Sequence, residues 1–235
     1  MKQFLFTLCG ILSFTIFLNT DATGQSGCES AYMPFKQDVF YELTNYDKKG
    51  KVTGINRHTI SEVVPTANGY KAAVSVDVLD DKEKELTKTS FEFECDGDVL
   101  RLDMSAMLDP SVNESLQGME VELSGDALQI PSKLSPGMEL PDAELEIKAM
   151  SGGVKIMTIR QSVTDRKVEG TETVTTPAGT FECIKITQTT EMKMLVKKKF
   201  KTVSWYALGV GMVKSETYDK KGKLQGSTVL TAFEG

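Results

Sequence analysis

One short sequence occurs twice in this chain and constrains its fold more than any other feature. Residues 46–51 read YDKKGK, and residues 218–223 repeat the same letters. Asp-Lys-Lys-Gly suits a type I turn whose fourth residue has a positive φ, a conformation that glycine adopts without a Cβ penalty. Strand-like sequence flanks both copies, so each copy is predicted to be the tip of a β-hairpin. Two such hairpins, far apart in the sequence, indicate an antiparallel β fold.

The first 24 residues are predicted to be a cleaved signal peptide. Lys2 provides a positive start, and residues 4–18 form an apolar run that is short for a membrane-spanning helix. Small residues precede Gln25, so the mature chain is expected to span residues 25–235 as a single domain. An uncleaved membrane anchor is one alternative. A lipoprotein anchored at Cys28, which follows a partial lipobox, is the stronger alternative.

Charge and cysteine content limit the remaining classes of protein. The formal net charge is −6, so the chain has no general attraction for nucleic acid. Cys28, Cys95 and Cys183 follow the predicted signal peptide, and in an oxidising compartment two of them would pair. A Cys28–Cys95 disulfide with Cys183 buried and free is favoured, although the sequence leaves other pairings open. With one histidine in the chain, a zinc site is poorly supplied with ligands, and no metal or cofactor is expected.

Apolar and polar residues alternate along most of the chain after residue 38. Phe91, Phe93 and Cys95 fall on one face of a strand, while the glutamates between them fall on the other. This period of two is typical of a sheet with one solvent-exposed face. A run of mixed charge at residues 80–85 is interpreted as a solvated hairpin tip. Longer strands are expected at residues 143–150, 154–175, 181–196 and 200–207.

One segment departs from this alternation. Residues 104–117 place Met104, Met107 and three further apolar residues near helical spacing, with Pro110 in the first turn. We expect one short helix here, which either packs on the sheet as core or lines a cavity with its adaptable methionines. The predicted fold is therefore all-β: an antiparallel wrapped sheet or half-open β-barrel with one short helix.

The sequence contains no recognisable catalytic constellation. His58 is the only histidine, and no nucleophile, metalloprotease, phosphate-binding or calcium-binding motif accompanies it. Carboxylate pairs such as Glu92 and Glu94 have the spacing of neighbours on one solvated strand face. The sequence therefore favours a protein that is not an enzyme. A hydrolase whose cleft forms only in the folded chain is the least favoured alternative.

Four segments resemble one known family. They are residues 140–143 (LPDA), 165–170 (DRKVEG), 176–186 (TPAGTFECIKI) and 205–214 (WYALGVGMVK). Together they resemble the exported TapB-like proteins, a family carrying a domain of unknown function, over essentially the whole mature chain. The sequence is also similar to YmcC-like and LolA-like envelope proteins, which have a half-open β-barrel or a wrapped antiparallel sheet. The resemblance implies export to the periplasm or outer envelope of a Gram-negative bacterium, and it supplies no catalytic residues.

A curled sheet without catalytic residues leads to three hypotheses about function. The first is an envelope protein that binds an apolar or lipid-like small molecule in its concave face. The residues expected to line that site are Met104, Met107, Met192, Met194, Phe200 and Trp205. The second is a structural or interaction protein that binds an envelope protein or a glycan through its sheet edge or through a lysine face. That face would consist of Lys193, Lys197, Lys199 and Lys201. The third is the hydrolase.

Overall fold

The computed structural model describes residues 28, 31–104, 116, 118–194 and 196–235. In this part of the chain, thirteen strands make one antiparallel sheet. The strands are β1 (Phe40–Asp47), β2 (Val52–Pro65), β3 (Gly69–Leu79), β4 (Glu85–Asp96), β5 (Val99–Leu102), β6 (Glu120–Gly125), β7 (Leu128–Pro131), β8 (Ala143–Ser151), β9 (Val154–Thr176), β10 (Gly179–Lys193), β11 (Lys197–Ala207), β12 (Gly211–Tyr218) and β13 (Leu224–Glu234). Across the sheet they follow the order β6-β8-β9-β10-β11-β12-β13-β1-β2-β3-β4-β5-β7. Strands β1 and β13 are thus neighbours at the centre of the sheet, where Phe40 pairs with Glu234.

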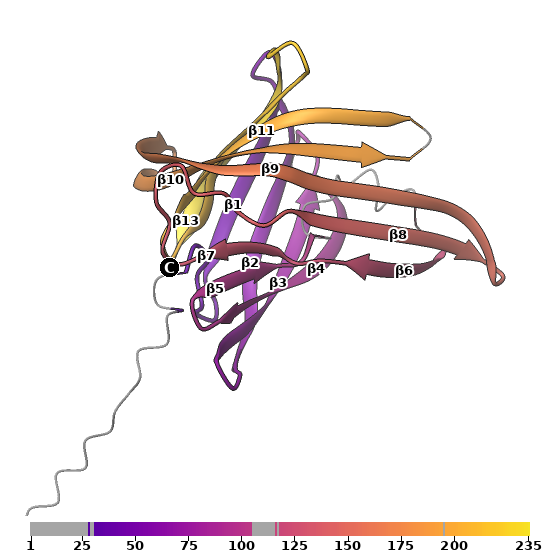
Figure 1. Ribbon diagram of the computed structural model, residues 1–235, viewed down its shortest axis with the longest axis horizontal. Helices are drawn as coiled ribbons and strands as arrows, with labels where there is room; N and C mark the ends of the chain where they lie inside the picture. The colour runs from indigo at the N-terminus through magenta and orange to yellow at the C-terminus, as the bar shows by residue number, and fades with distance from the viewer. Residues whose placement is uncertain (1–27, 29–30, 105–115, 117, 195) are drawn as a thin grey trace, which may run out of the picture.

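The sheet is strongly curled. In Figure 1, strands β6, β8, β9 and β10 run across the direction of strands β1 to β4. Strand β9 also contacts β12, although two strands separate them in the sheet. The predicted all-β, antiparallel wrapped fold is confirmed. Of the helix expected over residues 104–117, only Met104 and Leu116 belong to the described residues, and both are buried; the rest lies outside them.

Burial follows the alternation in the sequence. Val74, Val76 and Val78 of β3 are buried, and the residues between them are less so. Full burial of a valine side chain stabilises the fold by about 1.5–3 kcal/mol relative to exposure. Two main apolar cores result. The larger includes Ile60 and Leu230, and the smaller one is built largely from β8 and β9.

The repeated YDKKGK segment forms the predicted turn. The backbone N–H of Gly50 donates to the carbonyl of Asp47 (3.0 Å), and Gly50 has a φ of 78°. The Asp47 carboxylate accepts hydrogen bonds from the backbone N–H groups of Lys51 (2.9 Å) and Lys49 (2.8 Å), which lower the pKa of that carboxyl. Asp219 accepts the same pair of bonds in the second copy.

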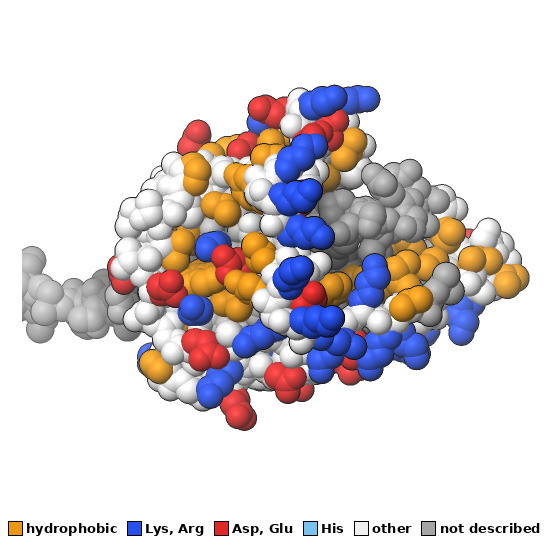
Figure 2. Space-filling model, turned by 90° about the horizontal axis from the view of Figure 1, so that it is seen from above, with side chains coloured by type: hydrophobic (Ala, Val, Ile, Leu, Met, Phe, Trp, Pro, Cys, Tyr) orange, Lys and Arg blue, Asp and Glu red, His pale blue; other side chains and the backbone are white. Residues whose placement is uncertain are grey.

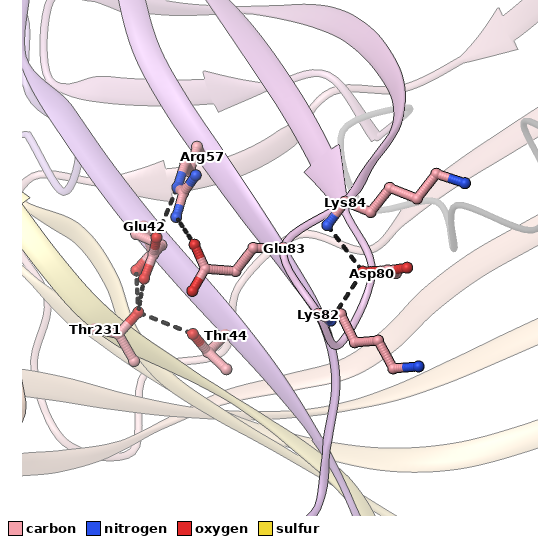
Figure 3. A network of polar contacts seen from close by, with 8 residues as sticks. All are labelled: Glu42, Thr44, Arg57, Asp80, Lys82, Glu83, Lys84 and Thr231. Carbon is pink, nitrogen blue, oxygen red and sulfur yellow. Dashed lines mark hydrogen bonds and ion pairs between the residues drawn. The ribbon is translucent and has the colours of Figure 1, made fainter.

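The run of mixed charge forms the same turn a third time. The Asp80 carboxylate accepts hydrogen bonds from the backbone N–H groups of Lys84 (2.9 Å) and Lys82 (2.8 Å), as Figure 3 shows. The fourth residue of this turn is Glu83, with a φ of 62°, where Gly50 stands in the first copy. A residue with a Cβ costs about 1–2 kcal/mol in this left-handed conformation. The predicted hairpin tip is confirmed, and it carries this strain.

Charged side chains of β1 and β2 lie on one face of the sheet. Arg57 donates to Glu42 from Nε (2.9 Å) and to Glu83 from Nη2 (2.9 Å) (Figure 3). Successive residues of a strand point to opposite faces. Tyr41, which precedes Glu42, and His58, which follows Arg57, therefore point to the other face of the sheet. We call the face that carries Arg57 the outer face and the one that carries His58 the concave face.

A disulfide joins Cys28 to Cys95, as predicted, and Cys183 is free and buried. The bond attaches the segment before β1 to strand β4. Gly69 of β3 lies directly against it: a Cβ on Gly69 would lie 2.1 Å from the carbonyl oxygen of Cys95 and 2.7 Å from Cys28 Sγ. No residue with a side chain fits there, so Gly69 is required for this close approach.

Candidate ligand-binding cavity

The curl of the sheet forms a cavity of about 720 Å³ on its concave face. Its walls come from β1 to β5 on one side and from β9 to β13 on the other. Apolar lining residues include Leu43, Val78, Leu86, Phe91, Met192 and Phe200. Polar lining residues include Asn45, Asn56, His58, Gln161, Gln188, Thr190, Thr202 and Ser204. Among the described residues that line it there is no Asp, Glu, Lys or Arg.

Strand β11 shows how charge is kept out of this cavity. Thr202 and Ser204 line the cavity, whereas Lys201 and Val203 lie on the outer face. The alternation of the strand thus sends the hydroxyls of Thr202 and Ser204 inward and the side chains of Lys199 and Lys201 outward. Since β1 and β2 place Glu42 and Arg57 on the outer face in the same way, the concave face is an uncharged surface built from both parts of the sheet.

His58 lies in the wall of the cavity between two aromatic rings. It stacks on Tyr41, with ring centroids 4.4 Å apart and planes 5° apart, and meets Phe91 edge-on at 6.2 Å. Its side chain is 7% exposed, and Nδ1 has no hydrogen-bond partner among the described residues. Burial lowers the pKa of His58 to about 4, so the imidazole is neutral at neutral pH. No described side chain activates it as a catalytic base.

Two glutamines add further unpartnered atoms to the same cavity. Gln161 of β9 and Gln188 of β10 are 3% and 4% exposed. Among the described residues, nothing hydrogen-bonds Gln161 Oε1 or Gln188 Nε2. An unsatisfied buried polar group costs about 1–3 kcal/mol. Three such atoms around one cavity, counting His58 Nδ1, indicate that the cavity is suited to a molecule with polar groups as well as an apolar body.

Arg166 lies behind Gln188. Its Nη1 donates to the backbone carbonyls of Pro141 (2.7 Å) and Gln129 (3.0 Å), and its Nε donates to Gln188 Oε1 (3.4 Å). The side chain is 2% exposed, and burial lowers the pKa of its guanidinium. The ordinary value is so high that the group stays charged.

A second depression, of about 660 Å³, lies on the outer face. Its described lining has four lysines, two carboxylates and two large aromatic rings: Lys185, Lys199, Lys201, Lys220, Glu216, Asp219, Trp205 and Tyr218. No described residue forms an ion pair with Lys199, Lys201 or Lys220. Figure 2 shows Lys and Arg side chains gathered in a band on the face that it displays. The outer face therefore offers a basic groove, back to back with the uncharged cavity.

Trp205 is held firmly in this groove. Its Nε1 donates to a carboxylate oxygen of Glu172 (3.1 Å), and the ammonium groups of Lys185 and Lys214 lie 5.1 and 4.9 Å from its ring centroid. These contacts leave the indole 5% exposed. Cation–π pairs of this kind contribute about 0.5–1 kcal/mol each at a surface. Trp205 is thus a structural anchor of β11 on the outer face.

The residues expected to line a ligand site lie in three different parts of the structure: the cavity, the smaller apolar core and the outer groove. Met192 lines the cavity, and Phe200 lines both the cavity and the outer groove. Met104 belongs to the smaller core, and Met194 is partly buried against that core. Trp205 lines the outer groove instead, and Met107 lies outside the described residues.

Sequence reasoning did not identify Gln161, Gln188 or His58 as lining residues. Counting back from Met192 in steps of two leads through Thr190 to Gln188. A glutamine on the otherwise apolar face of a predicted strand was the available signal. Gln161 lies on the neighbouring strand β9, opposite Met192, whereas His58 lies on β2, which is remote in the sheet order, so no local pattern connects it to Gln188.

The fold and the cavity define a small all-β protein with an uncharged interior site, and comparison with known proteins places it in a family. Residues 38–230 match the family model described as DUF3108-like, and the chain belongs to that family. The predicted resemblance to a family with a domain of unknown function is confirmed. Comparison with curated proteins gives no match.

Two solved structures have the same fold. One is a Bacteroides fragilis protein described as exported and as having a YmcC-like fold, with 24% identity and a TM-score of 0.74. The other is described as a lipoprotein of Parabacteroides distasonis, with 21% identity and the same TM-score. Each alignment covers 86% of this chain and 98% of the other. The predicted YmcC-like fold is confirmed, while the TapB-like and LolA-like relations stay predictions.

No helix in the described ranges is long and apolar enough to cross a bilayer. Within the same residues, no group of three or more His, Cys, Asp and Glu side chains is arranged to hold a metal ion.

Proposed function

We propose that this protein is exported to the bacterial envelope and binds an apolar or lipid-like ligand, without catalysis, in the cavity on its concave face. The observation that supports this function is the cavity itself: about 720 Å³, with an uncharged lining and three buried polar atoms that lack partners in the described structure. Small-molecule sites usually have volumes of about 300–1,000 Å³ and mostly apolar walls with a few polar groups.

Export is supported by three observations. The predicted signal peptide precedes the family domain, and the disulfide suits an oxidising compartment. Relatives with the same fold are described as an exported protein and a lipoprotein. We place the mature protein in the periplasm or outer envelope of a Gram-negative bacterium. We also propose that Cys28 is oxidised and carries no lipid, because the disulfide uses the sulfur that a lipid thioether would need.

The first test is native mass spectrometry of the protein purified from its own envelope, followed by organic extraction. A stoichiometric apolar adduct on the 25–235 chain is expected. The same spectrum shows whether Cys28 carries a lipid. A ligand-free mass under gentle ionisation, with nothing apolar in the extract, would refute the proposal.

A pair of adjacent substitutions distinguishes the two faces of the sheet. Thr190 lines the cavity and Thr189 lines the outer groove, and both lie on β10. Thr190→Trp places an indole in the cavity and is expected to reduce the amount of adduct. Thr189→Trp adds the same bulk to the outer face and is expected to leave the adduct unchanged. Equal loss in both variants would argue against the cavity as the site.

The second candidate function is binding of an acidic protein or glycan in the outer groove. The observation that favours it is the group of lysines, Lys199, Lys201 and Lys220, that no described carboxylate neutralises. Such a partner would be lost with Lys199→Glu and Lys201→Glu and in high salt, because exposed charges are screened. Capture of a partner that these changes do not release would exclude the groove as its site.

A further inference from the structure

One buried cation of the described structure, Arg166, makes no hydrogen bond to a charged group among the described residues. Arg166 is 2% exposed, and its hydrogen bonds within the described structure all go to neutral acceptors: two backbone carbonyls and Gln188 Oε1. No carboxylate in the described chain lies within ion-pair distance of it, although Asp142 favours its charged form from further away. A buried cation without a paired anion is unfavourable by several kcal/mol. The structure therefore retains a feature that costs stability.

The contact with Arg166 fixes the orientation of the Gln188 amide. A guanidinium can only donate hydrogen bonds, so the group of Gln188 that faces it must be the carbonyl oxygen. The amide nitrogen, Nε2, then points away from Arg166. It is buried, has no partner among the described residues, and belongs to a side chain that lines the cavity. Gln188 thus holds unpartnered N–H donors within the wall of the cavity, polarised by the cation behind them.

The surroundings of this donor carry no compensating negative charge. The described lining of the cavity contains no carboxylate. Tyr206 also lines the cavity and interacts electrostatically with Arg166. Burial raises the pKa of the Tyr206 hydroxyl, and the positive charge of Arg166 opposes that rise. His58, the titratable group of the opposite wall, is neutral at neutral pH. The described lining therefore offers no charge that offsets the charge of Arg166 behind Gln188.

We infer that the ligand is an apolar carboxylate, such as an ionised fatty acid, whose head group accepts a hydrogen bond from Gln188 Nε2 and neutralises Arg166. One unpaired positive charge matches one negative charge. The apolar tail occupies the remainder of the cavity, against residues such as Phe91, Met192 and Phe200. This inference rests on the proposed function, and it names the class of ligand for the same site.

The experiment compares two ligands that differ only in their head group. Dodecanoate and 1-dodecanol are titrated into the oxidised 25–235 protein at about pH 8, where the acid is ionised. A charge-assisted hydrogen bond in a buried site favours the acid by on the order of tenfold or more. Equal binding of the acid and the alcohol would overturn the inference and leave the proposed function standing. Binding of neither ligand would overturn both.

Matched variants test whether Gln188 causes the preference for the acid over the alcohol. Gln188→Met removes the donor, and Gln188→Glu replaces it with a carboxylate that pairs with Arg166 and preserves the packing. Both are expected to abolish the preference for the acid while the alcohol still binds. Gln161→Met makes the same change in the same cavity, on a side chain that is not among the hydrogen-bond partners of Arg166 in the described structure, and is expected to keep the preference. Retention of the preference in a Gln188→Glu protein with an unchanged melting temperature would refute the subsite.

Discussion

His58 links the stability of this protein to pH, and replacing it with phenylalanine tests that link. The imidazole is buried, stacks on Tyr41, and has an Nδ1 atom without a partner in the described structure. Phenylalanine keeps a ring against Tyr41 and removes the group that titrates. The comparison of the two proteins therefore isolates the proton-binding behaviour of one side chain.

The magnitude follows from the difference between the folded and unfolded pKa values. Burial lowers the pKa of His58 from 6.5 to about 4 in the folded protein. Between these values the unfolded chain binds a proton and the folded chain does not, so stability falls as the pH falls from 6.5 towards 4. The His58 contribution is fully present above pH 6.5, and below pH 4 no further loss occurs. Linkage gives a loss of about 2 kcal/mol at pH 5 and about 3 kcal/mol at pH 4.

The assay is urea unfolding of both proteins between about pH 7.5 and pH 4, with the free energy of unfolding extrapolated to water. Carboxylates with lowered pKa values, such as Asp47 and Glu172, weaken both proteins equally in acid and cancel in the comparison. The His58→Phe protein is expected to become more stable relative to wild type by about 2 kcal/mol on going from pH 7.5 to pH 5. A difference that stays constant across this range would refute the reasoning.

Three further predictions concern single sites. Burial, reinforced by nearby glutamates, raises the pKa of Cys183 to about 11, so the thiol should resist maleimide in the folded protein and react once urea unfolds it. Glu83 has a φ of 62°, so the Glu83→Gly variant should be more stable than Glu83→Ala by about 1 kcal/mol, whereas alanine is usually the more stabilising of the two. Both variants remove the contact with Arg57, so the difference between their unfolding free energies in urea reports the backbone alone. Replacing both Cys28 and Cys95 with serine removes a cross-link between residues 67 apart in the chain and should lower the free energy of unfolding, measured in urea, by about 4 kcal/mol. A loss below about 1 kcal/mol would show that the disulfide constrains the unfolded chain little.

The local features of this fold could be predicted from the sequence. The turn at Asp47 and its second copy depend on residues next to one another, and so does the burial of alternate residues such as Val74 and Val76. The strain at Glu83 could not be predicted, because the run of mixed charge has a glutamate where YDKKGK has its glycine. The two segments share only the aspartate and the lysines that follow it. A turn held by an Asp carboxylate tolerates a different fourth residue, and only the structure shows that it does.

The candidate site was less predictable because its parts are remote in sequence. The alternation of β11 separates Thr202 from Val203, but each face carries polar and apolar residues, so the pattern does not say which face is concave. Trp205 therefore could not be distinguished from a cavity residue. The neutral acceptors around Arg166 come from three different segments, and no spacing along the chain reveals that its hydrogen bonds in the described structure go to neutral groups.

The pairing of β1 with β13 also determines the order in which the molecule can form. Hairpins such as β9–β10 join strands adjacent in the chain, so they can form as soon as both strands are present. The seam between β1 and β13 joins strands from remote parts of the chain, and until β13 arrives the sheet consists of two separate parts. During export from the N-terminal end, as proposed, the last strand to emerge is the one that unites them. Loss of β13 would therefore leave two smaller sheets, each with a new free edge, and no cavity between them.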